Sequence, residues 1–126
     1  METGFLGNLY RDGEVIIRES EPGDCMFVVQ AGQVEVVQQQ QGQEVLLGVL
    51  AEEDIFGEMS LFTGEPRSAT VRALGECRIL TIEKRSFLRR VHEDPSLAFR
   101  ILQRLCFRIK ELDAEIMARK VEDTAA

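Results

Sequence analysis

Between residues 13 and 82, short β-branched runs recur along the chain and turn-forming residues separate them. The runs are Val15–Ile17, Met26–Val29, Val34–Val37, Val45–Leu47, Ala69–Val71 and Ile79–Ile82. The predicted turns are Glu21–Asp24, Ala31–Gly32, the glutamine stretch around Gly42 and Thr63–Pro66. The glutamine stretch is predicted to be the polar tip of a hairpin. Many short strands at this spacing predict a mainly β domain, a sandwich or a barrel.

The apolar spacing changes after residue 82 from two to three or four. This change predicts a short helix from about Lys84 to Val91. Asp94 and Pro95 then predict the start of a long helix, because the carboxylate can cap free N–H groups and proline is tolerated at the first helical position. We expect this second helix to continue to about Arg119.

Apolar residues on the long helix follow a heptad rhythm, with alternating spacings of four and three. This seam consists of Ala98, Leu102, Leu105, Ile109, Leu112 and Ile116. The pattern favours a homodimer through Leu102, Leu105, Ile109, Leu112 and Ile116. The seam covers only about two and a half heptads, so packing against the chain's own barrel is the alternative.

The chain has 126 residues, of which 44% are hydrophobic, enough for one core. We therefore expect a single domain over residues 1–126, with the barrel over about 10–82 and the C-terminal helices over about 84–120. No run approaches the roughly 18 apolar residues of a membrane span, and the start lacks a signal-peptide pattern. The expectation is a soluble, cytoplasmic protein that does not enter a membrane.

Charge is distributed unevenly along the chain. The net charge is −7, from 15 Lys and Arg against 22 Asp and Glu; residues 83–120 hold ten of the basic and six of the acidic ones. Five basic and sixteen acidic residues therefore remain for the barrel and the tail. This balance argues against direct nucleic-acid binding, which needs clustered Lys and Arg. Any anion at the barrel must be held by specific local donors.

Metal and disulfide chemistry have little support in the sequence. Cys25, Cys77 and Cys106 are too far apart for a C-x-x-C zinc site or a disulfide framework. His92 is the single histidine, whereas a jelly-roll metalloenzyme needs several metal ligands. We therefore expect no bound metal and no enzymatic activity.

An interruption of the strand pattern, from Asp54 to Val71, carries the candidate binding residues. A glycine enters a short helical turn there, and the open N–H groups at the start of such a turn suit an anion. These donors would come from Gly57, Glu58, Met59 and Ser60. Arg67 follows a proline and can pair with two phosphate oxygens in one plane, and Ser68 can add a hydroxyl or N–H group. The Glu58 carboxylate would repel phosphate but accept from a sugar hydroxyl, so the set suits a phosphorylated ribose.

Residues 56–71 closely resemble the phosphate-binding cassette of the cyclic nucleotide-binding domain family, which includes protein kinase A regulatory subunits, cyclic-nucleotide-gated channels and bacterial catabolite activator proteins. Residues 12–34 resemble the first strands of that family. The resemblance implies an eight-stranded jelly-roll barrel with flanking helices. It also implies that Glu58 holds the ribose 2′-hydroxyl and Arg67 the cyclic phosphate, with Gly57, Met59, Ser60 and Ser68 around them.

The implied function is a non-enzymatic sensor of cAMP, or alternatively of cGMP, that signals through its C-terminal helices. Ser68 is common in cAMP-binding bacterial members, whereas a threonine there is associated with cGMP. Leu112 and Asp113 stand where bacterial relatives carry base-contacting hydroxyls, which leaves the base open. The family's output segments do not follow here, so the chain is a stand-alone receiver or a fragment. The alternative is a ligand-free jelly-roll interaction or dimerisation module, in which Glu58 and Arg67 form a salt bridge.

Overall fold

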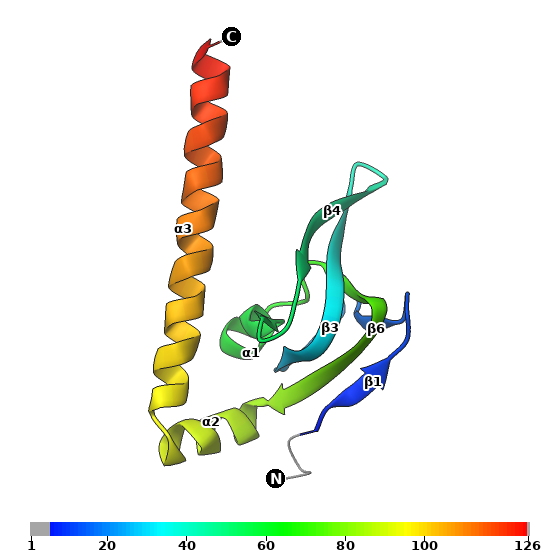
Figure 1. Cartoon of the computed structure of the whole chain (residues 1–126), viewed down its shortest axis with the longest axis vertical. Coiled ribbons are helices and arrows are strands. Elements are labelled where there is room, and N and C mark those ends of the chain that lie inside the picture. Colours follow the sequence, from blue (N-terminus) through cyan, green and yellow to red (C-terminus); the bar gives the residue numbers. More distant parts are fainter. Residues whose placement is uncertain (1–5, 126) are drawn as a thin grey trace. The chain divides into compact units, whose positions relative to one another are not determined.

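The structure is a computed structural model that describes residues 6–125, with side chains described as far as residue 119. It divides into two compact units, one up to Ser86 and one from Phe87 onward, and each is described by itself. The elements are labelled in Figure 1. They are β1 (Asn8–Tyr10), β2 (Val15–Ile17), β3 (Cys25–Gln40), β4 (Gln43–Leu50), β5 (Ile55–Phe56), α1 (Glu58–Thr63), β6 (Thr70–Glu83), α2 (Lys84–Glu93) and α3 (Ser96–Ala125).

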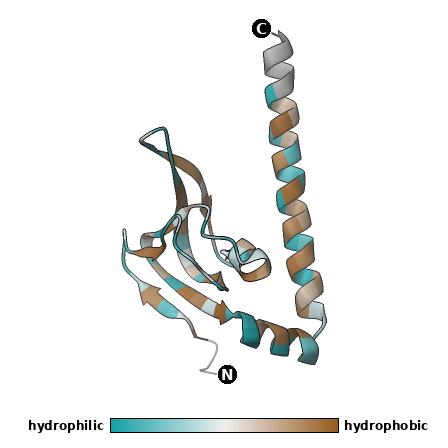
Figure 2. Cartoon of the chain, turned by 180° about the vertical axis from the view of Figure 1, so that it is seen from behind, coloured by the Kyte–Doolittle hydropathy of each residue, from teal (hydrophilic) through white to brown (hydrophobic). Residues whose placement is uncertain are grey.

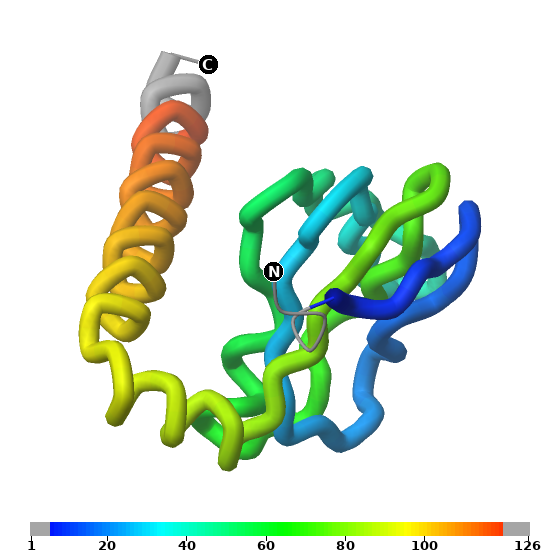
Figure 3. The backbone as a smooth tube through the Cα atoms, turned by 60° about the horizontal axis from the view of Figure 1, so that its bottom comes forward, coloured from blue at the N-terminus to red at the C-terminus, as the bar shows by residue number. Residues whose placement is uncertain are grey.

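The first unit is built on one antiparallel sheet. Its strand order is β1-β6-β3-β4, with β2 paired to β6 and β5 paired to β3. The two longest strands, β3 and β6, pair through most of their length and curve together in the tube view (Figure 3). The predicted class, a β-rich domain followed by a short helix and a long helix, is confirmed.

The strand count differs from the eight strands that the family resemblance implies. Among the described residues there are six strands, because β3 has 16 residues and β6 has 14. The predicted turn at Ala31–Gly32 is wrong, because both residues lie inside β3. Gly32 has a φ of 83°, and the register between β3 and β6 shifts on both sides of Ala31. A bulge bends a strand without ending its ladder, so one long strand takes the place of two.

The hydrophobic core of the sheet follows the alternation of side chains along its strands. The buried cluster comprises Ile17, Phe27, Val29, Val34, Phe56, Val71, Ala73, Cys77 and Ile79. Burial raises the pKa of the Cys77 thiol. The three cysteines are free, with Cys77 buried, Cys25 half-buried and Cys106 exposed.

The predicted polar hairpin tip is confirmed. β3 ends at Gln40 and β4 begins at Gln43, with Gln41 at φ 52° and Gly42 at φ 79° between them. Two central residues with positive φ form the type of turn that matches the twist of a two-residue hairpin. The glutamines therefore close a hairpin that projects from the sheet (Figure 1).

The helices begin close to the predicted residues. The Asp94 carboxylate accepts hydrogen bonds from the Ser96 N–H at 3.1 Å and the Ser96 hydroxyl at 2.5 Å, and these bonds lower the pKa of Asp94. The predicted end at Arg119 is too early, since α3 continues to Ala125 and neither glycine nor proline interrupts it. Hydrophobic and hydrophilic residues interleave along α3 (Figure 2). No described helix has the length and apolar character needed to cross a bilayer.

Candidate functional site

The cassette begins where β5 leaves the sheet. Phe56 pairs with Phe27 of β3, and the next residue, Gly57, has a φ of 76°, which L side chains rarely adopt. This left-handed residue turns the chain into α1, as the sequence predicts. The helix ends at Gly64, also left-handed with φ 74°, whose N–H donates to the Ser60 carbonyl at 2.9 Å.

Main-chain hydrogen bonds tie the arginine of the cassette to the segment after β2. The Arg67 N–H donates to the Glu21 carbonyl at 2.9 Å, and the Ser20 N–H donates to the Arg67 carbonyl at 2.8 Å. The loop after α1 is thereby paired with a loop more than 40 residues earlier in the chain. This pairing directs the Arg67 side chain towards the start of β3.

The Arg67 guanidinium is buried, with 8% of the residue exposed. Its Nη1 donates to the Gly57 carbonyl at 2.8 Å, and its Nη2 donates to the Cys25 carbonyl at 2.9 Å and lies 3.5 Å from the Cys25 sulfur. Its Cζ lies 5.5 Å from the centre of the Phe27 ring, within the range of a cation–π interaction. Phe27 in turn stacks on Phe56, with ring centres 5.1 Å apart. The positive charge is therefore held in a fixed place by main-chain oxygens and an aromatic ring.

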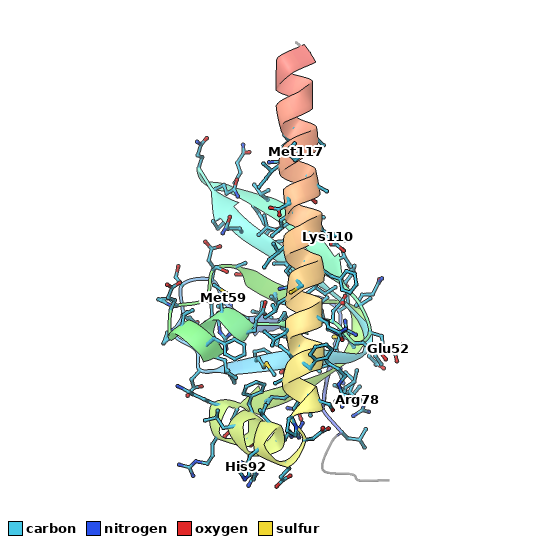
Figure 4. The ribbon with its side chains drawn as sticks, turned by 90° about the vertical axis from the view of Figure 1, so that its left-hand side faces the viewer. Glu52, Met59, Arg78, His92, Lys110 and Met117 are labelled. Carbon is cyan, nitrogen blue, oxygen red and sulfur yellow. The ribbon has the colours of Figure 1, made fainter. Side chains whose placement is uncertain are left out.

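The other predicted site residues fall into two groups. Glu58 and Ser60 are buried, at 5% and 3% exposure, and the Ser60 hydroxyl donates to the Glu65 carbonyl at 2.8 Å, which braces the loop before Arg67. Met59, labelled on α1 in Figure 4, is 56% exposed. Ser68 is also exposed, and its carbonyl accepts from the Gln38 side chain at 2.9 Å. The structure thus brings the Gly57 carbonyl directly to Arg67 and leaves Met59 and Ser68 at the surface.

Three residues around the guanidinium were not among the predicted site residues: Gly23, Cys25 and Phe27. A Cβ built on Gly23 would lie 2.2 Å from Arg67 Nε. Cys25 contributes a main-chain carbonyl, which any residue type could supply, so sequence offers no signal for it. Phe27 lies in the predicted strand Met26–Val29, whose four residues are all apolar, so the sequence did not single out its ring as a neighbour of the arginine.

A cavity of about 190 Å³ lies beside the arginine. It is lined by Val15, Ile16, Ile17, Arg18, Glu21, Pro22, Phe27 and Arg67. Its walls come from β2, the loop after it, the start of β3 and the end of the cassette. The cavity is smaller than the roughly 300–1,000 Å³ usual for small-molecule sites.

The predicted seam of α3 is exposed along most of its length. Leu102, Ile109, Leu112 and Ile116 are between 51% and 59% exposed, and Leu105 is half-buried. Phe99 and Phe107, at 62% and 64%, add to the exposed apolar surface.

Comparison with known families identifies this chain. Residues 8–94 match the model of the cyclic nucleotide-binding domain. The chain belongs to the cyclic nucleotide-binding domain family. The match begins at β1 and ends just after α2, so it includes the whole sheet and the cassette.

The relatives include regulatory proteins and an enzyme. The cAMP-dependent protein kinase regulatory subunit of Mycosarcoma maydis is 38% identical over 85 residues, which cover 64% of this chain and 16% of that protein. The crystal structure of Thermus thermophilus catabolite activator protein has a TM-score of 0.80 at 28% identity, covering 90% of this chain and 54% of that one. The cAMP-bound form of the EAL enzyme Bd1971 has a TM-score of 0.63 at 30% identity, and the match covers 88% of this chain and 32% of that one. The cGMP-bound form of the same enzyme has a TM-score of 0.63 at 32% identity, and the match covers 76% of this chain and 27% of that one.

The chain spans only part of these relatives. It covers 20%, 16% and 26% of three kinase regulatory subunits. The activities and partners of the whole relatives are therefore not assigned to this chain by the match.

Proposed function

We propose that this chain is a non-enzymatic cytoplasmic sensor of a cyclic nucleotide, cAMP in the first place and cGMP as the alternative. The observation that carries the proposal is the buried guanidinium of Arg67. Within the described part of the chain, its side-chain hydrogen-bond partners are two carbonyl oxygens and a sulfur atom. Carbonyl dipoles hold a guanidinium in place without cancelling its charge, so an anionic phosphate gains from approaching it.

The cassette residues take distinct roles in this proposal. Arg67 pairs with the cyclic phosphate and Glu58 accepts from the ribose 2′-hydroxyl. Gly57, Met59, Ser60 and Ser68 surround the same groups with main-chain N–H and hydroxyl donors. The exposure of Met59 is compatible with a role of its main chain rather than of its side chain.

The choice of cAMP rests on the relatives. The Mycosarcoma maydis protein is named for cAMP, and Bd1971 has been solved with cAMP and with cGMP, so a domain of this family accepts either base. Ser68 after the arginine is the second support for cAMP. The two nucleotides differ only in the base, so a direct comparison of them isolates this part of the proposal.

The signalling step in the proposal uses the C-terminal helices. Nucleotide shifts these helices only if it binds two of their arrangements with unequal affinity. The exposed seam of α3 suits a homodimer through Leu102, Leu105, Ile109, Leu112 and Ile116. Sedimentation equilibrium with and without nucleotide tests this step: we expect a dimer that Leu112→Glu dissociates, and a monomer under both conditions would remove the dimer from the proposal.

Thermal unfolding with cAMP, cGMP and AMP tests the sensor itself. A ligand at 100 times its dissociation constant adds about 2.7 kcal/mol of stability, which raises the unfolding midpoint visibly. We expect a shift with cAMP, a smaller one with cGMP, and none with AMP, which has the same base but an open phosphate. No shift with either cyclic nucleotide would favour the ligand-free interaction module, for which the exposed seam of α3 is the supporting observation.

A further inference from the structure

The loop between β2 and β3 packs a glycine directly onto the Arg67 side chain. A Cβ built on Gly23 would lie 2.2 Å from Arg67 Nε, 2.4 Å from Cζ and 2.5 Å from Nη2. Real Cβ atoms essentially never lie within 3.0 Å of an atom to which they are not bonded. The absence of a side chain at Gly23 is what makes room for the guanidinium.

This glycine is required for space rather than for its backbone conformation. Gly13, Gly32 and Gly57 have φ between 76° and 83°, a region that L side chains rarely adopt, whereas Gly23 does not lie in that region. An alanine at position 23 is therefore free of that backbone strain. The atoms that it would meet are at the far end of a flexible side chain, so the guanidinium moves before the backbone does.

A second glycine also lies against the guanidinium. A Cβ on Gly57 would lie 2.7 Å from Arg67 Nη1, the atom that donates to the Gly57 carbonyl at 2.8 Å. Gly23 and Gly57 therefore both leave room for the guanidinium, which also faces the Phe27 ring. The loop that carries Gly23 is bonded to the cassette through the Arg67 N–H and the Glu21 carbonyl, so Gly23 is held beside the arginine.

We propose that Gly23 is a positioning residue for ligand binding: it holds the plane of the Arg67 guanidinium in the orientation that pairs with the cyclic phosphate. The effect of Gly23 on affinity rests on the proposed function, whereas its effect on the position of Arg67 rests on the packing alone. A guanidinium donates to two phosphate oxygens only when they lie in its plane, so a rotation of the Arg67 guanidinium lowers affinity even when its charge stays nearby. Gly23 acts through Arg67 and needs no contact with the ligand.

Two readouts on Gly23→Ala test this inference, with Gly48→Ala as the matched control. A Cβ on Gly48 would meet nothing within 4 Å, and Gly48 also lacks a positive φ. The first readout is the Arg67 Nε–Hε signal in a ¹⁵N-correlated NMR spectrum, assigned by its loss in Arg67→Ala. The second is calorimetric titration with cAMP. We expect Gly23→Ala to move the Arg67 signal and to weaken cAMP binding by about tenfold or more, the effect of losing a charge-assisted hydrogen bond, and Gly48→Ala to do neither.

The double variant Gly23→Ala/Arg67→Ala separates a positioning role from a general one. If Gly23 acts through Arg67, the alanine at position 23 changes affinity by less than about twofold once the arginine is gone. An Arg67 signal that stays in place in Gly23→Ala, or an equal loss of affinity in both backgrounds, overturns the inference. Should Gly23→Ala alone fail to fold, the double variant is compared with Arg67→Ala: the alanine at position 23 must cost little further stability there, and a loss of folding that Arg67→Ala alone does not show overturns the inference too.

The two readouts also separate this inference from the proposed function. If the wild-type chain binds no cyclic nucleotide but Gly23→Ala moves the Arg67 signal, the sensor is refuted and the control of Arg67 by Gly23 stands. If the wild-type chain binds cAMP and the Arg67 signal does not move, the sensor stands and the inference falls.

Discussion

Two arginines five residues apart in this chain have opposite surroundings. Arg67 is buried and its guanidinium meets carbonyl oxygens and an aromatic ring. Arg72, on β6, has a side chain that is 29% exposed and forms ion pairs across the sheet. Its Nε lies 2.6 Å from a Glu35 carboxylate oxygen on β3, and its two terminal nitrogens lie 2.9 Å and 2.7 Å from the Glu44 carboxylate on β4.

The two arginines differ in how the protein balances their charges. At Arg72 two carboxylates already balance the charge: their hydrogen bonds raise the pKa of Arg72, and the same contact lowers the pKa of Glu44. Among the described residues, Arg67 meets carbonyl dipoles, a sulfur atom and a ring but no carboxylate at ion-pair distance, so in our proposal a phosphate supplies the compensating charge. Arg72 serves to join three strands, and Arg67 is the arginine that we propose binds an anion.

The largest expected effect on stability is that of Arg67→Ala. This change leaves the Gly57 and Cys25 carbonyls without their donor, and an unsatisfied buried group costs about 1–3 kcal/mol. We expect the free energy of unfolding, measured by urea denaturation, to fall by about 2–4 kcal/mol. Arg72→Ala is the matched control, and an equal loss in both variants would remove the distinction between the two arginines.

A smaller effect is expected for Phe27→Leu, which removes the ring that stacks on Phe56 and faces Arg67. The loss of an aromatic pair costs about 0.5–1.5 kcal/mol beyond the change in buried area. We expect cAMP affinity to fall several-fold as well, because the guanidinium loses one wall of its site. Ile79→Val is the control, because it removes one methyl group from the same core at a residue that does not contact Arg67. An equal change of affinity in that variant would show that Phe27 acts only through stability.

Arg72→Ala is expected to change stability less, by about 0–1 kcal/mol, because exposed ion pairs contribute little and are screened by salt. Its affinity for cAMP should stay at the wild-type value. Urea denaturation in low and high salt checks the first part, and the difference between wild type and variant should shrink as salt rises. A large loss of nucleotide binding would place Arg72, rather than Arg67 alone, in the site.

The smallest expected effect is a pH dependence at Glu44. Because the pKa of Glu44 is lower in the folded state, its ion pair stabilises the fold above the unfolded-state pKa of about 4.3, and this contribution is lost as pH falls through the lowered value. Unfolding midpoints of wild type and Glu44→Gln should therefore differ at pH 6 and converge in acid. A difference that is constant with pH would contradict this assignment.

The parts of the fold that depend on neighbouring residues were predictable from the sequence. Gly57 before a short helix, Asp94 before α3 and the turn at Gly42 each act within a few positions of the chain. The break expected at Gly32 was wrong because a glycine with positive φ has the same local signature in a bulge as in a turn. β1 has three residues and no alternating pattern, so only its pairing with β6 defines it.

The candidate site also has a part that was predictable from local sequence and a part that was not. Glu58 and Arg67 were predicted from a compact segment, but the groups that hold Arg67 come from residues far from it in sequence. Cys25 is 42 positions away and contributes a carbonyl. Gly23 contributes only the absence of a side chain. Contacts of this kind depend on which distant segments become neighbours in the fold, and no local pattern around Gly23 or Cys25 signals that proximity.

Calorimetric titration of cAMP into the wild-type chain, Arg67→Ala and Arg72→Ala, at one pH and one salt concentration, tests most directly whether Arg67 anchors a cyclic nucleotide. The account predicts saturable binding to the wild-type chain, a loss of about tenfold or more in Arg67→Ala, and a change of less than about twofold in Arg72→Ala. Wild-type affinity in a folded Arg67→Ala, or equal losses in the two variants, would contradict it.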